Sequence, residues 1–476
     1  MDPYIELFKL VLPEEIVENF DLVSIHYSAD IDGRQVAHLH LDEMDMEEEE
    51  RGNLIPNGFY NEQIIQDFPI RDKKVILHVR RRRWKTPEGK SSSRKWDLKA
   101  PGTRMSKDFA GLLKKYLDTY PITARSLEKF FHIDGDQFER AYKDHLSGFR
   151  HWPPLSHAEQ WVVNYRDIGP RVSIDETSLP DGELYTIVSN KDAHGRKGSI
   201  IAMVRGTRTE DVVKALKTIL WYERAKVLEV TMDFSESMHA IVQECFPYAT
   251  ITIDRFHVMK EVLEPVQQLR IKHKHEAHRA EVEGREQFKH RNRKNAEQRK
   301  RYASKLKAEG RKKSARGRKP NRSNEQYKPE RLANGDTLPE LLTRSRYLLA
   351  VSPEKWTESQ RTRARLLFER YPDIKTAYGL AHGLRMIFSK RNATIASGKE
   401  SLGVWFREVA EFDDKNFNTV AATIFERQGE ILNYFLHRET NASAESLNSK
   451  IKAFRAQLHG VVDVKFFLYR LFTIWG

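Results

Sequence analysis

The 476-residue sequence has a single cysteine, Cys245, which we expect to be a core residue. One cysteine excludes an intramolecular disulfide and any zinc site built from several cysteines. No apolar run approaches the roughly 20 residues of a membrane span. The start, Met-Asp-Pro-Tyr-Ile-Glu, has neither the basic nor the apolar part of a signal peptide. We therefore expect a reducing, intracellular setting and no membrane partner.

Positive charge is concentrated in one part of the chain. The whole sequence has 81 Lys and Arg against 68 Asp and Glu, a net charge of +13. Residues 270–331 contain 23 Lys and Arg against 8 Asp and Glu, an excess of 15. The remainder is therefore close to neutral. An excess of one sign in one segment favours phosphate binding, and the alternative is a solvated helix face.

Residues 1–100 indicate a small β-containing region, with strands expected at 36–41 and 75–79. The second strand runs into Arg80, Arg81, Arg82, Arg83 and Trp84. Adjacent arginines can bind a phosphate backbone, and a tryptophan can stack on a base. We therefore count these five residues as candidate DNA contacts. The alternative is a charged edge strand that resists aggregation.

Residues 101–165 indicate a helical region. Apolar stripes at helical spacing recur between Ser106 and Leu146, and a turn is expected at Asp134-Gly-Asp. A short helix, a tight turn and a further helix are typical of a DNA-binding helix-turn-helix. An ordinary three-helix packing unit fits the same pattern, so both interpretations stay open.

Residues 166–260 change to a sheet pattern. Strands are expected at 172–175, 184–188, 199–204, 227–232 and 249–253, with a helix before and after the fourth. This βββαβαβ order predicts a ribonuclease H-like mixed α/β fold, in which the first and fourth strands are parallel neighbours. Asp175 and Asp233 end those two strands, so we expect them side by side at one edge of the sheet.

A long helical stretch, 261–435, separates this sheet from the C-terminal helices at 436–476. Within it, we expect DNA contacts from Arg311, Lys312, Lys313, Arg316, Arg318 and Lys319. In the last part, Glu445, Asn448 and Lys452 share one helical face, and Arg455 follows on the same helix. Asn448, Lys452 and Arg455 are thus placed to contact phosphates near Glu445. Three converging carboxylates, Asp175, Asp233 and Glu445, could hold two divalent cations.

The chain resembles the DDE transposases of bacterial insertion sequences, specifically the L-three family, from about Arg171 to its C-terminus. The most specific pieces are Asp233-Phe-Ser-Glu-Ser, Ile253-Asp-Arg-Phe-His-Val258 and Thr440-Asn-Ala-Ser-Ala-Glu-Ser-Leu-Asn. The resemblance implies that Asp175, Asp233 and Glu445 are the catalytic triad and bind two Mg²⁺ or Mn²⁺ ions. It implies an accessory role for Asp254 and His257; alternatively, His257 caps a helix that begins near Val258.

The resemblance further implies cleavage and joining of double-stranded DNA, at element ends and target, by a dimer or higher homo-oligomer in the bacterial cytoplasm, associated with the nucleoid. One departure concerns the N-terminal region. Relatives often carry a cysteine zinc motif before a helix-turn-helix, whereas residues 75–96 contain no cysteine. Two alternatives remain: a nuclease of the same fold without strand transfer, and a non-catalytic DNA-binding protein of transposase origin.

Overall fold

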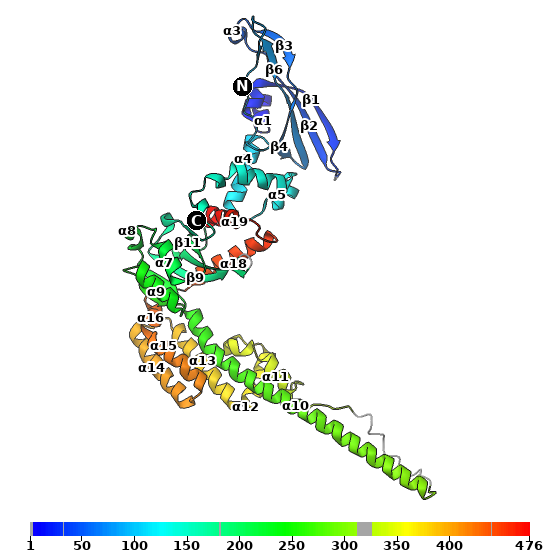
Figure 1. Cartoon of the computed structure of the whole chain (residues 1–476), viewed down its shortest axis with the longest axis vertical. Coiled ribbons are helices and arrows are strands. Elements are labelled where there is room, and N and C mark those ends of the chain that lie inside the picture. The colour runs from blue at the N-terminus through cyan, green and yellow to red at the C-terminus, as the bar shows by residue number, and fades with distance from the viewer. Residues whose placement is uncertain (1–2, 32, 180–181, 312–325, 439) are drawn as a thin grey trace. The chain divides into compact units, whose positions relative to one another are not determined.

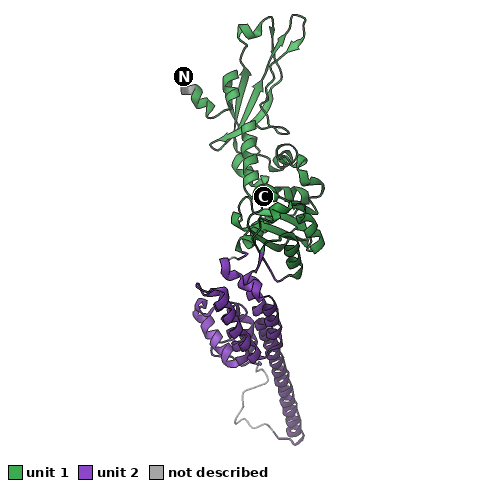
Figure 2. Ribbon diagram, turned by 90° about the vertical axis from the view of Figure 1, so that its left-hand side faces the viewer, with its two compact units in different colours: residues 1–230, 235–249, 442–476 green, residues 231–234, 250–441 purple. Residues whose placement is uncertain are grey.

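The computed structural model describes residues 3–31, 33–179, 182–311, 326–438 and 440–476 (Figure 1). The chain is a mixed α/β protein, as the sequence predicts. It divides into two compact units (Figure 2). Unit 1 comprises Met1–Val230, Ser235–Ala249 and Ala442–Gly476, and unit 2 comprises Thr231–Phe234 and Thr250–Asn441.

Unit 1 begins with two short helices, α1 (Pro3–Lys9) and α2 (Glu14–Asn19), and a four-stranded sheet. The sheet has the order β1-β2-β5-β4, with β1 Phe20–Ala29, β2 Gln35–Glu43, β5 Lys73–Arg80 and β4 Gln63–Ile70. Alternate residues such as Leu39, Leu41 and Leu77 are buried together with Ile16 of α2. The strands expected at 36–41 and 75–79 are therefore confirmed, and each is longer than expected.

A smaller sheet and three helices follow in unit 1. The sheet consists of β3 (Ile55–Phe59), β6 (Arg82–Lys85) and β7 (Ser91–Ser92), and α3 (Glu48–Arg51) precedes it. The helices are α4 (Lys107–Thr119), α5 (Ala124–Phe131) and α6 (Gly135–Ala141). Ser106, Thr123 and Asp134 each accept a backbone N–H at a helix start, which is the usual role of these residue types. The helices expected between Ser106 and Leu146 are thus confirmed.

The second large sheet has the order β13-β12-β9-β10-β11-β8. Its strands are β8 Trp161–Val163, β9 Arg171–Ser178, β10 Leu184–Asn190, β11 Ile200–Arg205, β12 Glu229–Met232 and β13 Thr250–Ile253. The hairpin of β10 and β11 is antiparallel, as predicted. The first and fourth predicted strands, β9 and β12, are neighbours, also as predicted. The edge strand β8 was not predicted, because three residues give too short a pattern.

The remaining α-helices of unit 1 are α7 (Thr209–Leu216), α8 (Trp221–Arg224), α9 (Glu236–Cys245), α18 (Ala442–Gln457) and α19 (Val464–Trp475). Apolar residues of α18 and α19 form one buried cluster with the hairpin, including Tyr185, Met203, Leu447, Phe454 and Leu471. The C-terminal segment therefore completes the core of unit 1. Cys245 is fully buried, and burial raises the pKa of its thiol to about 11, which confirms it as a core residue.

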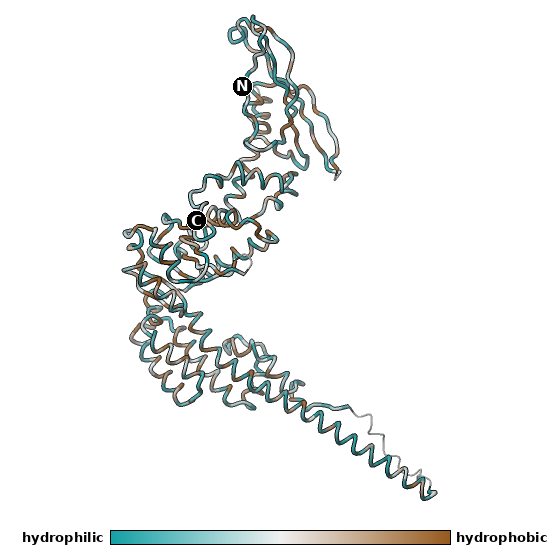
Figure 3. Tube along the Cα trace, viewed as in Figure 1, coloured by the Kyte–Doolittle hydropathy of each residue, from teal (hydrophilic) through white to brown (hydrophobic). Residues whose placement is uncertain are grey.

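Apart from short segments of the sheet, unit 2 is helical, as predicted for 261–435. Its helices are α10 Arg255–Ala308, α11 Leu338–Arg344, α12 Glu358–Arg370, α13 Pro372–Ser389, α14 Ile395–Phe412, α15 Lys415–Glu426, α16 Gln428–Leu432 and α17 Tyr434–His437. Only the first third of α10 is buried, through residues such as Val258, Val262 and Val266. Beyond Arg270 the helix is hydrophilic (Figure 3). Among the described helices, none has the length and apolarity needed to span a membrane.

Candidate active site

Asp175 lies in the middle of strand β9. The expectation that it ends the strand is wrong, because Thr177 and Ser178 still pair with residues of β10. The carboxylate is partly exposed, and its Oδ1 accepts a 2.8 Å hydrogen bond from the backbone N–H of Glu176. Asp175 is therefore fixed on a rigid strand while its side chain stays accessible.

Helix α18 is joined to this strand by a polar contact. The Nδ2 amide of Asn448 donates a 2.8 Å hydrogen bond to Oδ2 of Asp175, and Asn448 is 8% exposed. Glu445, exposed to solvent, lies three residues earlier on α18 and so on the same face. Lys452 is exposed and Arg455 is partly exposed further along the helix. The sequence placed these residues on one helix but did not predict the hydrogen bond to Asp175.

A lysine that no sequence motif points to anchors the same helix. Lys450 Nζ donates a 2.7 Å hydrogen bond to the backbone carbonyl of Gly195, in the connection between β10 and β11. Gly195 has a φ of +69°, which favours glycine, and an added Cβ would lie 3.1 Å from Lys450 Nζ. The turn and the lysine therefore fit each other closely. No sequence signal distinguishes this lysine from its neighbours.

Asp233 directly follows the last residue of β12, Met232, so the predicted end of this strand is correct. The side chain is partly exposed. Helix α9 begins three residues later, and Ser235 caps it by accepting the N–H of Met238. In the sheet order, β12 is the neighbour of β9, which carries Asp175.

Asp254 and His257 lie where β13 meets α10, within unit 2. Asp254 is 1% exposed, and its Oδ1 accepts a 3.2 Å hydrogen bond from the backbone N–H of Asn441. Its own N–H donates to Met232 O, the residue before Asp233. His257 is partly buried in the first turn of α10, which begins at Arg255. The alternative that His257 caps a helix near Val258 is therefore wrong, since Asp254 occupies the cap position.

The arginine run at the end of β5 is largely engaged within its own region. Arg80 Nε donates a 2.6 Å hydrogen bond to Asp42, although its side chain is 47% exposed. Arg82 Nε donates to Glu43 O and Arg83 Nε donates to Asn57 O. The guanidinium groups of Arg81 and Arg83 lie over the Tyr60 ring.

Trp84 does not behave as the sequence predicts for this run. The side chain is 0% exposed, so the prediction that it stacks on a DNA base is wrong. Trp84 lies on β6, the middle strand of the small sheet, with Pro56 of β3 and Ser92 of β7 as its neighbours on the two sides. Sequence pattern alone does not separate a buried tryptophan beside arginines from an exposed one.

The basic segment of unit 2 is only partly within the described residues. Arg311 is exposed, and the predicted contacts Lys312, Lys313, Arg316, Arg318 and Lys319 lie outside the described residues. Within the described residues, the excess of Lys and Arg lies mainly on the second half of α10, where most side chains are exposed. These lysines and arginines are accessible to a polyanion.

A family model described as a transposase, that of the L-three family of DDE transposases, matches residues 172–471. The match covers more than half of the chain, so the protein belongs to this family. The family implies DNA transposition, and with it DNA binding and cleavage. No curated protein matches the sequence.

Proposed function

We propose that the protein is a DNA transposase that cleaves phosphodiester bonds at the ends of a mobile element and joins the 3′ ends to target DNA. Asp175, Asp233 and Glu445 are the catalytic carboxylates of this proposal, on a ribonuclease H-like sheet. The observation that carries it is the hydrogen bond from Asn448 to Asp175. It brings the face of α18 that bears Glu445 against β9, and β12, which leads into Asp233, is the next strand of the sheet.

The donor set fits hard divalent cations. All three side chains offer carboxylate oxygens, which suit Mg²⁺ and Mn²⁺ better than softer metals, and all three are partly or fully exposed. We infer that the three residues would hold two such ions, which would supply activation of the attacking oxygen and charge stabilisation at the leaving oxygen. Asn448 would orient the Asp175 carboxylate for this role.

The DNA contacts belong to the same proposal. Lys452 and Arg455 follow Glu445 on α18 and would contact phosphates that flank the scissile bond. The exposed basic half of α10, with Arg311 and the segment after it, would bind element or target DNA through phosphates. Within the run Arg80–Arg83, Arg80 has the one side chain classed as exposed and is the best candidate for such a contact. Because an element has two ends, a homo-oligomer of two or more copies would act on DNA.

For this function the chain would be organised in five regions. Residues 1–100 form an N-terminal β region, and 101–165 form a helix-turn-helix-like DNA-binding region. Residues 166–260 and 436–476 form the two parts of the catalytic core. Residues 261–435 are the basic helical insertion.

The test is cleavage and strand transfer by the purified chain. The substrate is a labelled duplex with the inverted repeats that flank the gene, incubated with Mg²⁺ and a target plasmid. We expect nicked DNA and joined plasmid, both abolished by a chelator. Nicks without joining would indicate a nuclease of the same fold. Binding without either product would indicate a non-catalytic DNA-binding protein.

The variants Asp175→Asn, Asp233→Asn and Glu445→Gln should each abolish both products, because each removes a charged metal ligand. Their gel-shift affinity for the duplex should stay at the wild-type level. Glu411→Gln, an exposed carboxylate at the end of α14, is the matched control and should keep full activity. Substantial activity in any of the three variants would remove that residue from the triad.

A further inference from the structure

The N-terminal sheet β1-β2-β5-β4 has one packed face and one histidine-bearing face. The packed face contributes Leu39, Leu41 and Leu77 to the buried cluster. On a strand, the alternate residues point the other way. Those positions include His38 and His40 of β2, and His78 of β5. The histidines of these two neighbouring strands therefore lie on one face of the N-terminal sheet. None of them is part of the proposed catalytic triad.

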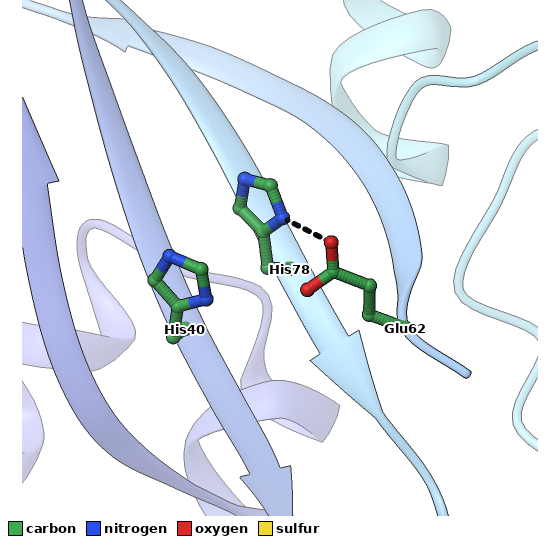
Figure 4. Close-up of side chains that lie close together, drawn as sticks. All are labelled: His40, Glu62 and His78. Carbon is green, nitrogen blue, oxygen red and sulfur yellow. Dashed lines mark ion pairs between the residues drawn. The ribbon is translucent and has the colours of Figure 1, made fainter. Parts of the chain in front are cut away.

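Strand register brings these side chains together. His40 is the direct partner of His78 in the parallel pairing of β2 with β5, and His26 is the partner of His38 in the pairing of β1 with β2. The rings of His40 and His78 stack with centroids 4.4 Å apart. Glu62, just before β4, extends toward His78 (Figure 4). His40, Glu62 and His78 each offer one ligand atom, and these atoms all lie within 4.8 Å of one another.

A chain of hydrogen bonds connects His78 to the neighbouring strands. Nε2 of His78 lies 2.9 Å from Nδ1 of His38, and Nε2 of His38 lies 2.8 Å from Oγ of Ser28. If His78 Nε2 donates, His38 accepts at Nδ1 and donates from Nε2 to the serine. Both rings are then neutral, and Nδ1 of His78 presents a lone pair toward Glu62.

The opposite direction of the chain would make His78 Nδ1 a donor to Glu62. Nδ1 and Glu62 Oε1 are 3.1 Å apart, but they are not aligned for a hydrogen bond. Nδ1 is also buried and makes no other hydrogen bond among the described residues. Both directions keep the two hydrogen bonds of the chain, but the first leaves no buried N–H donor without an aligned acceptor. It leaves a nitrogen lone pair and a carboxylate facing each other, an arrangement that a cation between them would stabilise.

We propose that His40, Glu62 and His78 form a binding site for a transition-metal dication of the Zn²⁺ class. Two imidazoles and one carboxylate are a known zinc donor set, with a fourth position left for water or another ligand. Imidazole nitrogens favour Zn²⁺, Ni²⁺ or Cu²⁺ over Mg²⁺ and Ca²⁺, so this site differs in chemistry from the carboxylate triad. His38 acts as the hydrogen-bond partner that fixes the ring of His78, a usual feature of metal-bound histidines.

The site has a structural consequence. Its ligands come from β2, from β5 and from the segment before β4, so a bound ion would cross-link three parts of the sheet. β4 and β5 are joined by a short turn, whereas β2 and β5 are far apart in sequence. Metal binding should therefore stabilise the pairing of β2 with β5. This inference does not depend on the proposed catalytic function.

The test is Zn²⁺ binding to the chelator-stripped full chain, measured by calorimetry in excess Mg²⁺, which occupies oxygen-donor sites. We expect one equivalent of Zn²⁺ that Mg²⁺ does not displace, and a rise in the thermal midpoint of the N-terminal region. The double variant His40→Ala/His78→Ala should no longer bind that equivalent. Asp175→Asn, in the proposed triad, should keep it.

Two further variants distinguish the loss of a metal contact from misfolding of the sheet. Glu62 is exposed and lies outside the strands, so Glu62→Gln should leave the sheet intact while weakening Zn²⁺ at least about tenfold. His38→Ala should weaken it about 10- to 100-fold. His278→Ala, an exposed histidine of α10, is the control and should change nothing. Equal Zn²⁺ binding by wild type and folded Glu62→Gln, or displacement by Mg²⁺, would overturn the proposal and leave a simple His78–Glu62 contact.

Discussion

The amide of Asn448 donates a 2.8 Å hydrogen bond to the carboxylate of Asp175, although the two residues are 273 positions apart. The bond joins helix α18 to strand β9 within unit 1. Asn448 is buried, whereas Asp175 stays partly exposed. The contact holds one oxygen of the Asp175 carboxylate in place. It also fixes the angular position of α18, and thereby the direction of Glu445.

Asn448→Ala should reduce the cleavage rate by about 10- to 100-fold, since it removes the group that orients a proposed metal ligand. Raised Mg²⁺ should restore part of the activity, whereas it would not restore activity to a variant that binds DNA poorly. Ser449→Ala, at an exposed neighbouring position on the same helix, should have no effect. A folded Asn448→Ala protein with wild-type rate and metal dependence would show that the hydrogen bond serves only packing.

The sequence predicted the elements that depend on local pattern. Five strands of the second sheet, the helical regions and the neighbouring positions of β9 and β12 follow from apolar spacing and from the order of elements. Local pattern does not show how far each strand pairing extends or what covers each face of a sheet, and the positions that depend on these were missed. Trp84 is buried on the middle strand of the small sheet, and strand β9 continues beyond Asp175 because β10 pairs with it.

The same limit applies to the side chains around the candidate sites. Glu445 and Asn448 share a face by helical spacing, but the partner of that face is set by packing of α18 on the sheet. His40 and His78 meet only through the register of two parallel strands. No local periodicity encodes that register, so neither contact was predictable from the sequence.

The basic half of α10 should dominate the salt dependence of DNA binding. Replacing the exposed residues Arg293, Lys294 and Lys300 by Gln should weaken binding to any duplex, because phosphate contacts carry no sequence information. The log–log salt slope should become shallower by about 0.9 for each phosphate that is no longer neutralised. Lys399→Gln, exposed on α14, is the control. An unchanged slope would identify this half of α10 as a solvated surface.

Arg470 should be important for the stability of unit 1. It is 3% exposed, and its guanidinium donates hydrogen bonds to the carbonyls of Leu117 and Ile122. Arg470→Met keeps most of the volume but leaves both carbonyls without these donors, so we expect the free energy of unfolding to fall by about 2–4 kcal/mol. The shift of the urea midpoint for the unfolding of unit 1 measures this change in stability. Arg140→Met, exposed on α6, should stay within about 0.5 kcal/mol of wild type.

The junction of β13 and α10 is hydrogen-bonded to the strand that leads into Asp233. The N–H of Asp254 donates to the carbonyl of Met232, the residue that precedes Asp233, and His257 lies in the first turn of α10. A histidine there could hydrogen-bond a metal-bound carboxylate and hold it in place. His257→Ala should then lower the cleavage rate by about 10- to 100-fold, with partial rescue by raised metal concentration. Lys260→Ala, exposed on the next turn, should leave both the rate and the metal dependence unchanged. Removing a residue that positions a metal ligand should change both the cleavage rate and its metal dependence. If the folded His257→Ala protein shows the wild-type rate and metal dependence, the histidine only packs the start of α10.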